Sequence, residues 1–211
     1  MARSFRRNLR WLTVGLALLG PAAALAQTRA ASLPTDGMGP QEREMLAIAQ
    51  DFARRSTEVL EGWISSKEVT EEKLFSFLYY PVAKTDPPKF TTEWDRFSDR
   101  DIQAIEEAVL SRNANIVYAV MVDKNGYLPT HNLRYSQPLT GNLANDLVNN
   151  RTKRIFNDQT GLAAAKNKSP FFFNKYQRDT GEVMVDLSVP IVLHGNHWGA
   201  VRIGYRLVDA R

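Results

Sequence analysis

The sequence predicts an α+β fold in which helices come first and an antiparallel sheet follows. Three observations carry this prediction. Apolar residues recur at intervals of three and four between Pro40 and Ser65, the pattern changes to strand-like alternation at Asn115, and three further strand signals follow one another closely near the C-terminus. Helices that precede a run of antiparallel strands typically pack on one side of the sheet.

The first half of the chain contains three helix signals. The longest covers Pro40–Ser65, with Pro40 in its first turn and a breaker at Gly62 or Ser65-Ser66. Thr70 is a candidate cap for a short helix that runs through Leu78 and is stopped by Pro81. Residues 85–94, with two prolines, are expected to be extended or looped. Ser98, with Asp101 three positions later, resembles a capping box for a third helix that buries Ile102, Ile105 and Val109.

The second half favours strands. Ile116–Val122 is rich in β-branched residues, and Asn125-Gly126 predicts a tight turn that returns the chain through Tyr127 and Leu128. Residues 141–158 are interpreted as a polar helix or loop. The last three strands are predicted at Pro170–Gln177, Glu182–Leu193 and Trp198–Val208.

The first 26 residues have the form of a secretory signal peptide. A basic segment, Met1–Arg10, precedes the apolar run Trp11–Leu19, and Ala24-Leu25-Ala26 offers small residues at both positions that a signal peptidase reads. We expect cleavage after Ala26, a flexible lead-in over residues 27–39, and a periplasmic mature protein. An uncleaved membrane anchor is the alternative. The chain has no cysteine, which excludes disulfides and thiolate metal sites.

The charge distribution argues against a nucleic-acid partner. The leader holds four arginines and no acidic residue, so the remaining chain has 23 basic and 23 acidic residues. The high isoelectric point therefore belongs to the leader, and no basic footprint for phosphate backbones is left.

Common enzyme and cofactor motifs are absent, including the glycine-rich phosphate loops, the nucleophile elbow and the zinc-binding HExxH. We therefore expect neither catalysis nor a cofactor. His194 and His197 lie three residues apart and could hold a metal with Asp186 or His131 as a third ligand. A hydrolase that uses such a metal is one alternative, although packing of His197 beside Trp198 is the simpler interpretation.

Polar and aromatic side chains gather on the predicted strands of the second half. In a small sheet such residues can line a pocket in which arginine pairs with a carboxylate and aromatic rings enclose the rest of a ligand. The alternative is that they point to water and pair across the sheet. These residues are Tyr118, His131, Arg134, Arg154, Tyr176, Asp186, His197, Trp198 and Arg202.

A succession of short motifs over residues 118–205 resembles the extracytoplasmic Cache sensor domains of bacterial methyl-accepting chemotaxis proteins. The motifs are Val122–Tyr127, Pro129–Asn132, Thr152–Phe156, Gly161–Asn167, Pro170-Phe171, Tyr176–Glu182, Asp186–Ile191 and His197–Gly199. The resemblance extends over about residues 42–207. It implies a single Cache domain at residues 40–211, with a PAS-like sheet packed on the long N-terminal helix, a small solute bound in the sheet's concave pocket, and no cofactor.

The chain departs from these receptors in that it ends at Arg211 with no signalling module after the last strand, and it lacks the Arg-x-Trp-Tyr signature of amino-acid sensors. We hypothesise a free-standing sensor domain that binds a small polar or anionic metabolite and relays occupancy to a membrane receptor or kinase. Arg154 is the expected charge partner, Tyr176 and Trp198 the walls, and His131 and Asp186 hydrogen-bonding groups, with Tyr118 beside them.

A protein-interaction module with a vestigial pocket is the main alternative, with the helix at residues 40–65 as a homodimer or partner interface.

Overall fold

The computed structural model describes residues 37–177 and 183–208. The predicted leader, most of the lead-in and the turn at residues 178–181 lie outside the described residues. The helical elements are α1 (Pro40–Ser65), α2 (Glu71–Phe75), α3 (Asp95–Phe97), η1 (Ser98–Ile102), α4 (Gln103–Leu110), η2 (Leu133–Tyr135), α5 (Leu143–Asn149) and α6 (Gln159–Ala165). The strands are β1 (Tyr80–Val82), β2 (Lys89–Thr91), β3 (Ile116–Asp123), β4 (Tyr127–Leu128), β5 (Arg154–Ile155), β6 (Phe172–Gln177), β7 (Val183–Leu193) and β8 (Asn196–Arg206).

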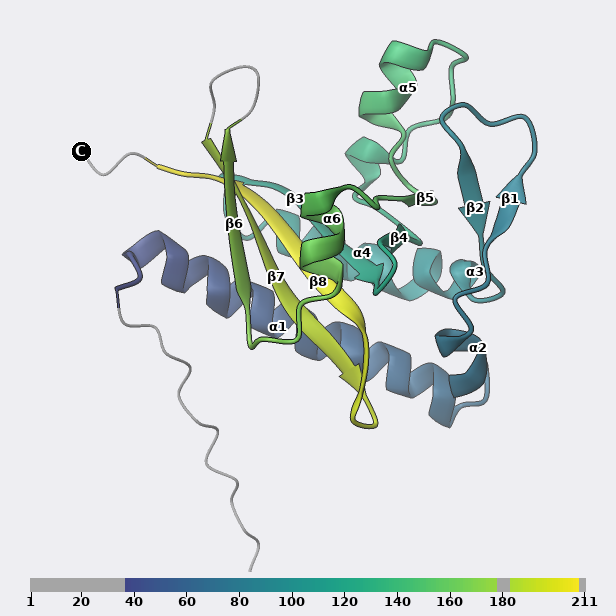
Figure 1. The fold of residues 1–211 in the computed structure, drawn as a ribbon, viewed down its shortest axis with the longest axis horizontal. Coiled ribbons are helices and arrows are strands. Elements are labelled where there is room, and N and C mark those ends of the chain that lie inside the picture. Colours follow the sequence, from purple (N-terminus) through teal and green to yellow (C-terminus); the bar gives the residue numbers. More distant parts are fainter. Residues whose placement is uncertain (1–36, 178–182, 209–211) are drawn as a thin grey trace, which may run out of the picture. The chain divides into compact units, whose positions relative to one another are not determined.

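The central feature is a four-stranded antiparallel sheet in the order β3-β8-β7-β6. Helix α1 runs across one face of this sheet and α6 lies against the other (Figure 1). Two-stranded pairs, β1 with β2 and β4 with β5, lie beyond the β3 edge. The α+β prediction, with a long N-terminal helix packed on an antiparallel sheet, is confirmed, and the arrangement is compatible with a PAS-like fold.

The core lies between α1 and the sheet. The apolar stripe of α1 includes Met45, Phe52, Leu60 and Trp63, all of them buried. Alternate residues of the two central strands face this stripe, because successive side chains of a strand point to opposite faces. On β7 and β8 these residues are Val185, Leu187, Val189, Ile191, Leu193, Val201, Ile203 and Tyr205.

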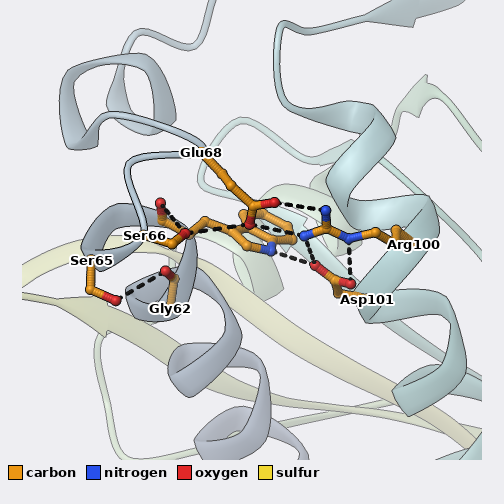
Figure 2. A network of polar contacts seen from close by, with 7 residues as sticks. Gly62, Ser65, Ser66, Glu68, Arg100 and Asp101 are labelled. Atoms are coloured by element: carbon orange, nitrogen blue, oxygen red, sulfur yellow. Dashed lines mark hydrogen bonds and ion pairs between the residues drawn. The ribbon is translucent and has the colours of Figure 1, made fainter.

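The C-terminal end of α1 is joined to η1 by a network of polar contacts (Figure 2). Arg100 donates two hydrogen bonds to Glu68, with Nη1–Oε1 at 2.7 Å and Nη2–Oε2 at 3.0 Å, and it also contacts Asp101. The indole Nε1 of Trp63 donates to Asp101 Oδ2 at 2.7 Å. The Trp63 bond comes from a buried ring, so it fixes the angle at which η1 meets α1.

Two helix boundaries differ from the prediction. The third helical segment begins at Asp95, and Ser98 is buried within it with no partner for its Oγ among the described residues, so Ser98 is no cap. Asp95 instead accepts a hydrogen bond from Thr92 Oγ1 at 2.7 Å. Helix α2 ends at Phe75, short of the predicted Leu78, because Phe77 has a left-handed backbone (φ 48°).

The Asn125-Gly126 turn forms, with Gly126 at φ +82°. The strand that follows it, β4, pairs with β5 and not with β3, so the predicted hairpin is not formed. Residues 85–94 are extended or looped as predicted, and the extended part is β2, which pairs with β1. Helix α5 and strand β5 both fall in the segment predicted as a polar helix or loop. Helix α6 had no counterpart among the elements expected from periodicity.

Side chains close the outer edge of β3. The backbone N–H of Ala119 donates to Asn132 Oδ1 at 2.8 Å, and that of Met121 donates to Glu106 Oε1 at 3.0 Å. Glu106 is fully buried, which raises the pKa of its carboxyl well above the usual range. These two side chains therefore take the place of a fifth strand along this part of the edge.

The described ranges contain no helix that is both long enough and apolar enough for a membrane span.

Candidate functional site

A cavity of about 250 Å³ lies against the face of the sheet opposite α1. Its walls come from β3, β6, β7 and β8, and from the connecting segment between β4 and α6. The lining combines three apolar side chains with aromatic, acidic and basic groups. The residues are Tyr118, Val120, Leu128, His131, Arg151, Phe156, Asp158, Thr160, Tyr176, Asp186 and Arg202.

One wall is built from three side chains that interact across three strands. Tyr118, Gly204 and Asp186 are direct neighbours on β3, β8 and β7. A Cβ on Gly204 would lie only 2.0 Å from Cε1 of Tyr118, so the absence of a side chain there lets the tyrosine ring cross β8. Its hydroxyl then donates to Asp186 Oδ2 at 2.9 Å, and Arg202 pairs with the same carboxylate.

This wall is electrically balanced. Asp186 is 1% exposed and Arg202 is 8% exposed, so their charges are largely removed from water. Burial opposes the charge of Arg202, but the Asp186 carboxylate outweighs that effect and raises the pKa of Arg202 above its usual range. Burial, followed by the charge of Asp186, raises the pKa of the Tyr118 hydroxyl. The wall therefore presents a neutral ion pair and a hydroxyl that keeps its proton.

His131 reaches the cavity as a neutral ring. Burial, followed by the charges of Arg151 and Arg202, lowers its pKa to about 3. Its Nδ1 accepts a hydrogen bond from the Asn132 backbone N–H at 2.7 Å, which assigns the ring proton to Nε2. Its centroid is 4.8 Å from that of Tyr135. At neutral pH His131 is thus an uncharged hydrogen-bond donor whose ring is held by Asn132 and Tyr135.

Arg151 supplies a positive charge that the surrounding chain does not balance. Its backbone N–H donates to Tyr135 O at 2.6 Å, which fixes the segment, and its guanidinium lies over the Phe156 ring with 4.9 Å from Cζ to the centroid. Its one side-chain hydrogen bond goes to Leu147 O, at the long distance of 3.5 Å. Within residues 37–177 and 183–208 it has no carboxylate partner, and burial lowers its pKa.

The structure brings together four of the six predicted site residues: Tyr118, His131, Tyr176 and Asp186 all line the cavity. Their role in binding stays a prediction, since their position alone does not test it.

Arg154, the expected charge partner, does not line the cavity, and Arg151 lies there instead. Arg154 also lies over the Phe156 ring, with 5.0 Å from Cζ to the centroid, but it does not line the cavity. Between the two arginines, Lys153 has a left-handed backbone (φ 61°) and lies in a turn directly before β5. No residue pattern in this segment predicts that turn, so the sequence does not indicate which of the two arginines lines the cavity.

Trp198 does not form a wall of this cavity. It is fully buried on the α1 side, where its Nε1 donates to Leu74 O at 3.1 Å and its ring contacts Trp94 at 5.7 Å between centroids. Strict alternation would place it on the same face as Arg202, four residues later. A register shift between Ile191 and Val192 adds one residue to β8 at this point and turns Trp198 to the opposite face.

The alternative metal site is not formed by the part of the chain that the structure describes, which holds no cluster of three or more potential metal ligands among His, Cys, Asp and Glu. His194 lies on an exposed turn and pairs with Glu71, with Nδ1–Oε2 at 2.9 Å. Asp186 is engaged by Arg202 and Tyr118. His194 and Asp186 thus have other partners, whereas the Nε2 of His197 is buried with no hydrogen-bond partner among the described residues.

No family model and no curated protein matches the chain. Among solved structures, an extracellular ligand binding receptor from Desulfohalobium retbaense DSM5692 is similar over 80% of this chain, with 15% sequence identity and a TM-score of 0.35. The chain spans 26% of the length of that receptor chain. A likeness at this level assigns neither a family nor a ligand, and the resemblance to Cache domains stays a prediction.

Proposed function

We propose that this protein is a sensor domain that binds a small anionic metabolite in the cavity and leaves it chemically unchanged. The observation that carries the proposal is Arg151, a guanidinium that lines the cavity without a carboxylate partner among the described residues. A positive charge held beside apolar walls favours an anion, and a guanidinium is shaped to hold a carboxylate through two parallel hydrogen bonds.

The other polar groups favour the same ligand class. Arg202 and Asp186 neutralise each other, so they add no net charge to the cavity. Asp158 lies at the exposed rim, where it accepts a hydrogen bond from the Gly161 N–H at 3.0 Å and water screens its charge. Arg151 is therefore the lining arginine that has no carboxylate partner among the described residues, and His131 adds a neutral donor. The ligand would carry one carboxylate or an equivalent single negative charge.

The leader sequence supports an extracytoplasmic location, and the resemblance to Cache domains supports a signalling role. We propose that bound ligand favours one conformation of the domain, which a partner protein then recognises. A membrane receptor or a kinase would be such a partner, and α1 would serve as the contact surface or as a homodimer interface.

The proposal is tested with the full chain, first by mass spectrometry of solutes released from the natively purified protein. A thermal-shift screen of short mono- and dicarboxylates and their neutral amides follows. A ligand at 100 times its Kd adds about 2.7 kcal/mol of stability. Recovery of the bound ligand unaltered after incubation is expected, and conversion into a product would refute the absence of catalysis.

The decisive comparison is Arg151→Gln against Arg154→Gln. Both guanidiniums lie over the Phe156 ring at nearly equal distances, but only Arg151 lines the cavity. We expect Arg151→Gln to weaken carboxylate binding about 10- to 100-fold, because a hydrogen-bonded ion pair contributes about 1.5–3 kcal/mol. Arg154→Gln should bind as the unaltered chain does. Equal effects of the two substitutions, or a panel with no ligand at all, would refute the anion site and favour the interaction module.

A further inference from the structure

A second chamber of about 170 Å³ adjoins the first cavity. Four residues line both spaces and form their common wall: Tyr118, His131, Arg151 and Tyr176. The remaining lining of the second chamber is Val117, Tyr135, Val148 and Met184, and it contains no charged group. The Arg151 guanidinium thus borders two spaces of different character.

The two chambers differ in what they can accept beside an anion. The first is lined by the polar side chains of Asp158, Thr160, Asp186 and Arg202, which prefer polar groups of a ligand. The second offers aliphatic and thioether surface from Val117 and Met184, which are 8% and 1% exposed. An apolar group that enters the second chamber therefore leaves water and covers a lining that is mainly apolar.

From this juxtaposition we infer that the site selects monocarboxylates with an apolar tail, whose carboxylate is held by Arg151 and whose tail occupies the second chamber. The inference rests on the proposed function, since it needs Arg151 to hold the anion. A volume of 170 Å³ corresponds to about five or six water molecules, which limits the length of the tail to roughly four to six carbons.

Val148 is the residue that sets the length of the tail. It lies on α5 and lines the second chamber, yet 57% of its surface is exposed, so an apolar tail beneath it would cover part of that surface. Because the position is exposed, a larger side chain there can be introduced without disturbing the core. Leu143 lies on the same helix, is also exposed and lines neither chamber, which makes it a matched control.

The test is calorimetric titration of the full chain with acetate, butanoate, hexanoate and octanoate, and with hexanamide as the uncharged analogue. Each buried methylene contributes about 0.8 kcal/mol, so affinity should rise about fourfold per carbon up to about hexanoate and then level off. Val148→Phe should abolish most of this gain while acetate binds as before. Leu143→Phe should leave the whole series unchanged, and hexanamide should bind at least tenfold more weakly than hexanoate.

The outcomes separate the two proposals. Affinity that is independent of chain length, or a gain that survives Val148→Phe, would overturn the tail chamber and leave the anion site intact. Equal binding of hexanamide and hexanoate would refute the role of Arg151 even if the length dependence holds. If none of the carboxylates binds, the proposed function fails and the selectivity fails with it.

Discussion

Replacement of Gly204 by alanine tests how the cavity wall is built. The added Cβ would lie 2.0 Å from Cε1 and 2.4 Å from Cζ of the Tyr118 ring, far inside van der Waals contact. The ring must move, and its hydroxyl then loses the 2.9 Å bond to the Asp186 carboxylate. Both effects fall on one side chain, so the cost of the substitution can be estimated term by term.

The overpacking costs about 1–3 kcal/mol, and the lost hydrogen bond to a charged acceptor about 1.5–3 kcal/mol. The lower chain entropy of alanine offsets about 0.5–1 kcal/mol. The net loss of unfolding free energy should be about 3 kcal/mol, or about 6–12 °C in Tm for a domain of this size. Thermal and urea unfolding followed by circular dichroism measure it.

Two further variants identify the cause. Gly62→Ala is the control, since no atom lies within 4 Å of its added Cβ, and it should stabilise α1 by about 0.5–1 kcal/mol. In a Tyr118→Ala background, Gly204→Ala should cost under about 1 kcal/mol, because the ring it would strike is gone. A loss that is equally large in that background, or a Gly204→Ala protein as stable as the original, would refute the crossing of the ring over β8.

Two other stability measurements follow from buried charges. Asp186→Ala leaves the Arg202 guanidinium buried without its partner and should lower the free energy of unfolding by about 3–5 kcal/mol. Glu58→Ala is the control, since it breaks an exposed pair with Arg54 and should lower that free energy far less. Similar losses in the two variants would contradict this account. Burial raises the pKa of Asp123 from 3.8 to about 6, so the folded state retains a proton that the unfolded chain has lost. The resulting stabilisation, about 3 kcal/mol, is present below about pH 4 and disappears as the pH rises through 6. Asp123→Asn should flatten this part of the stability profile, and an unaltered profile would refute it.

The predictable parts of the structure are those that local patterns determine. Alternation along β7 separates core residues such as Leu187 from Asp186, which faces the cavity, and this division follows from the period of a strand. The Asn125-Gly126 turn is likewise a local signal. The fold class and four of the six cavity residues could therefore be derived from the sequence.

The remaining features depend on single backbone irregularities. One extra residue in β8 sends Trp198 to the core, and one left-handed residue, Lys153, decides that Arg151 and not Arg154 lines the cavity. Neither the extra residue in β8 nor the left-handed backbone of Lys153 is required by the local sequence, so composition and periodicity do not predict them. Long-range packing fixes these positions, and only the folded chain shows it.

Asn132, which closes part of the edge of β3, also contacts a residue that lines the cavity. The backbone N–H of Asn132 donates to His131 Nδ1, and its side-chain Oδ1 accepts from the Ala119 N–H. Gln103 of α4 donates to the backbone carbonyl of His131 at 3.1 Å. A ligand that moved the imidazole would therefore disturb the hydrogen bond that holds Asn132 beside the edge of β3. Asn132 thus both occupies the edge of β3 and holds a ring that lines the cavity.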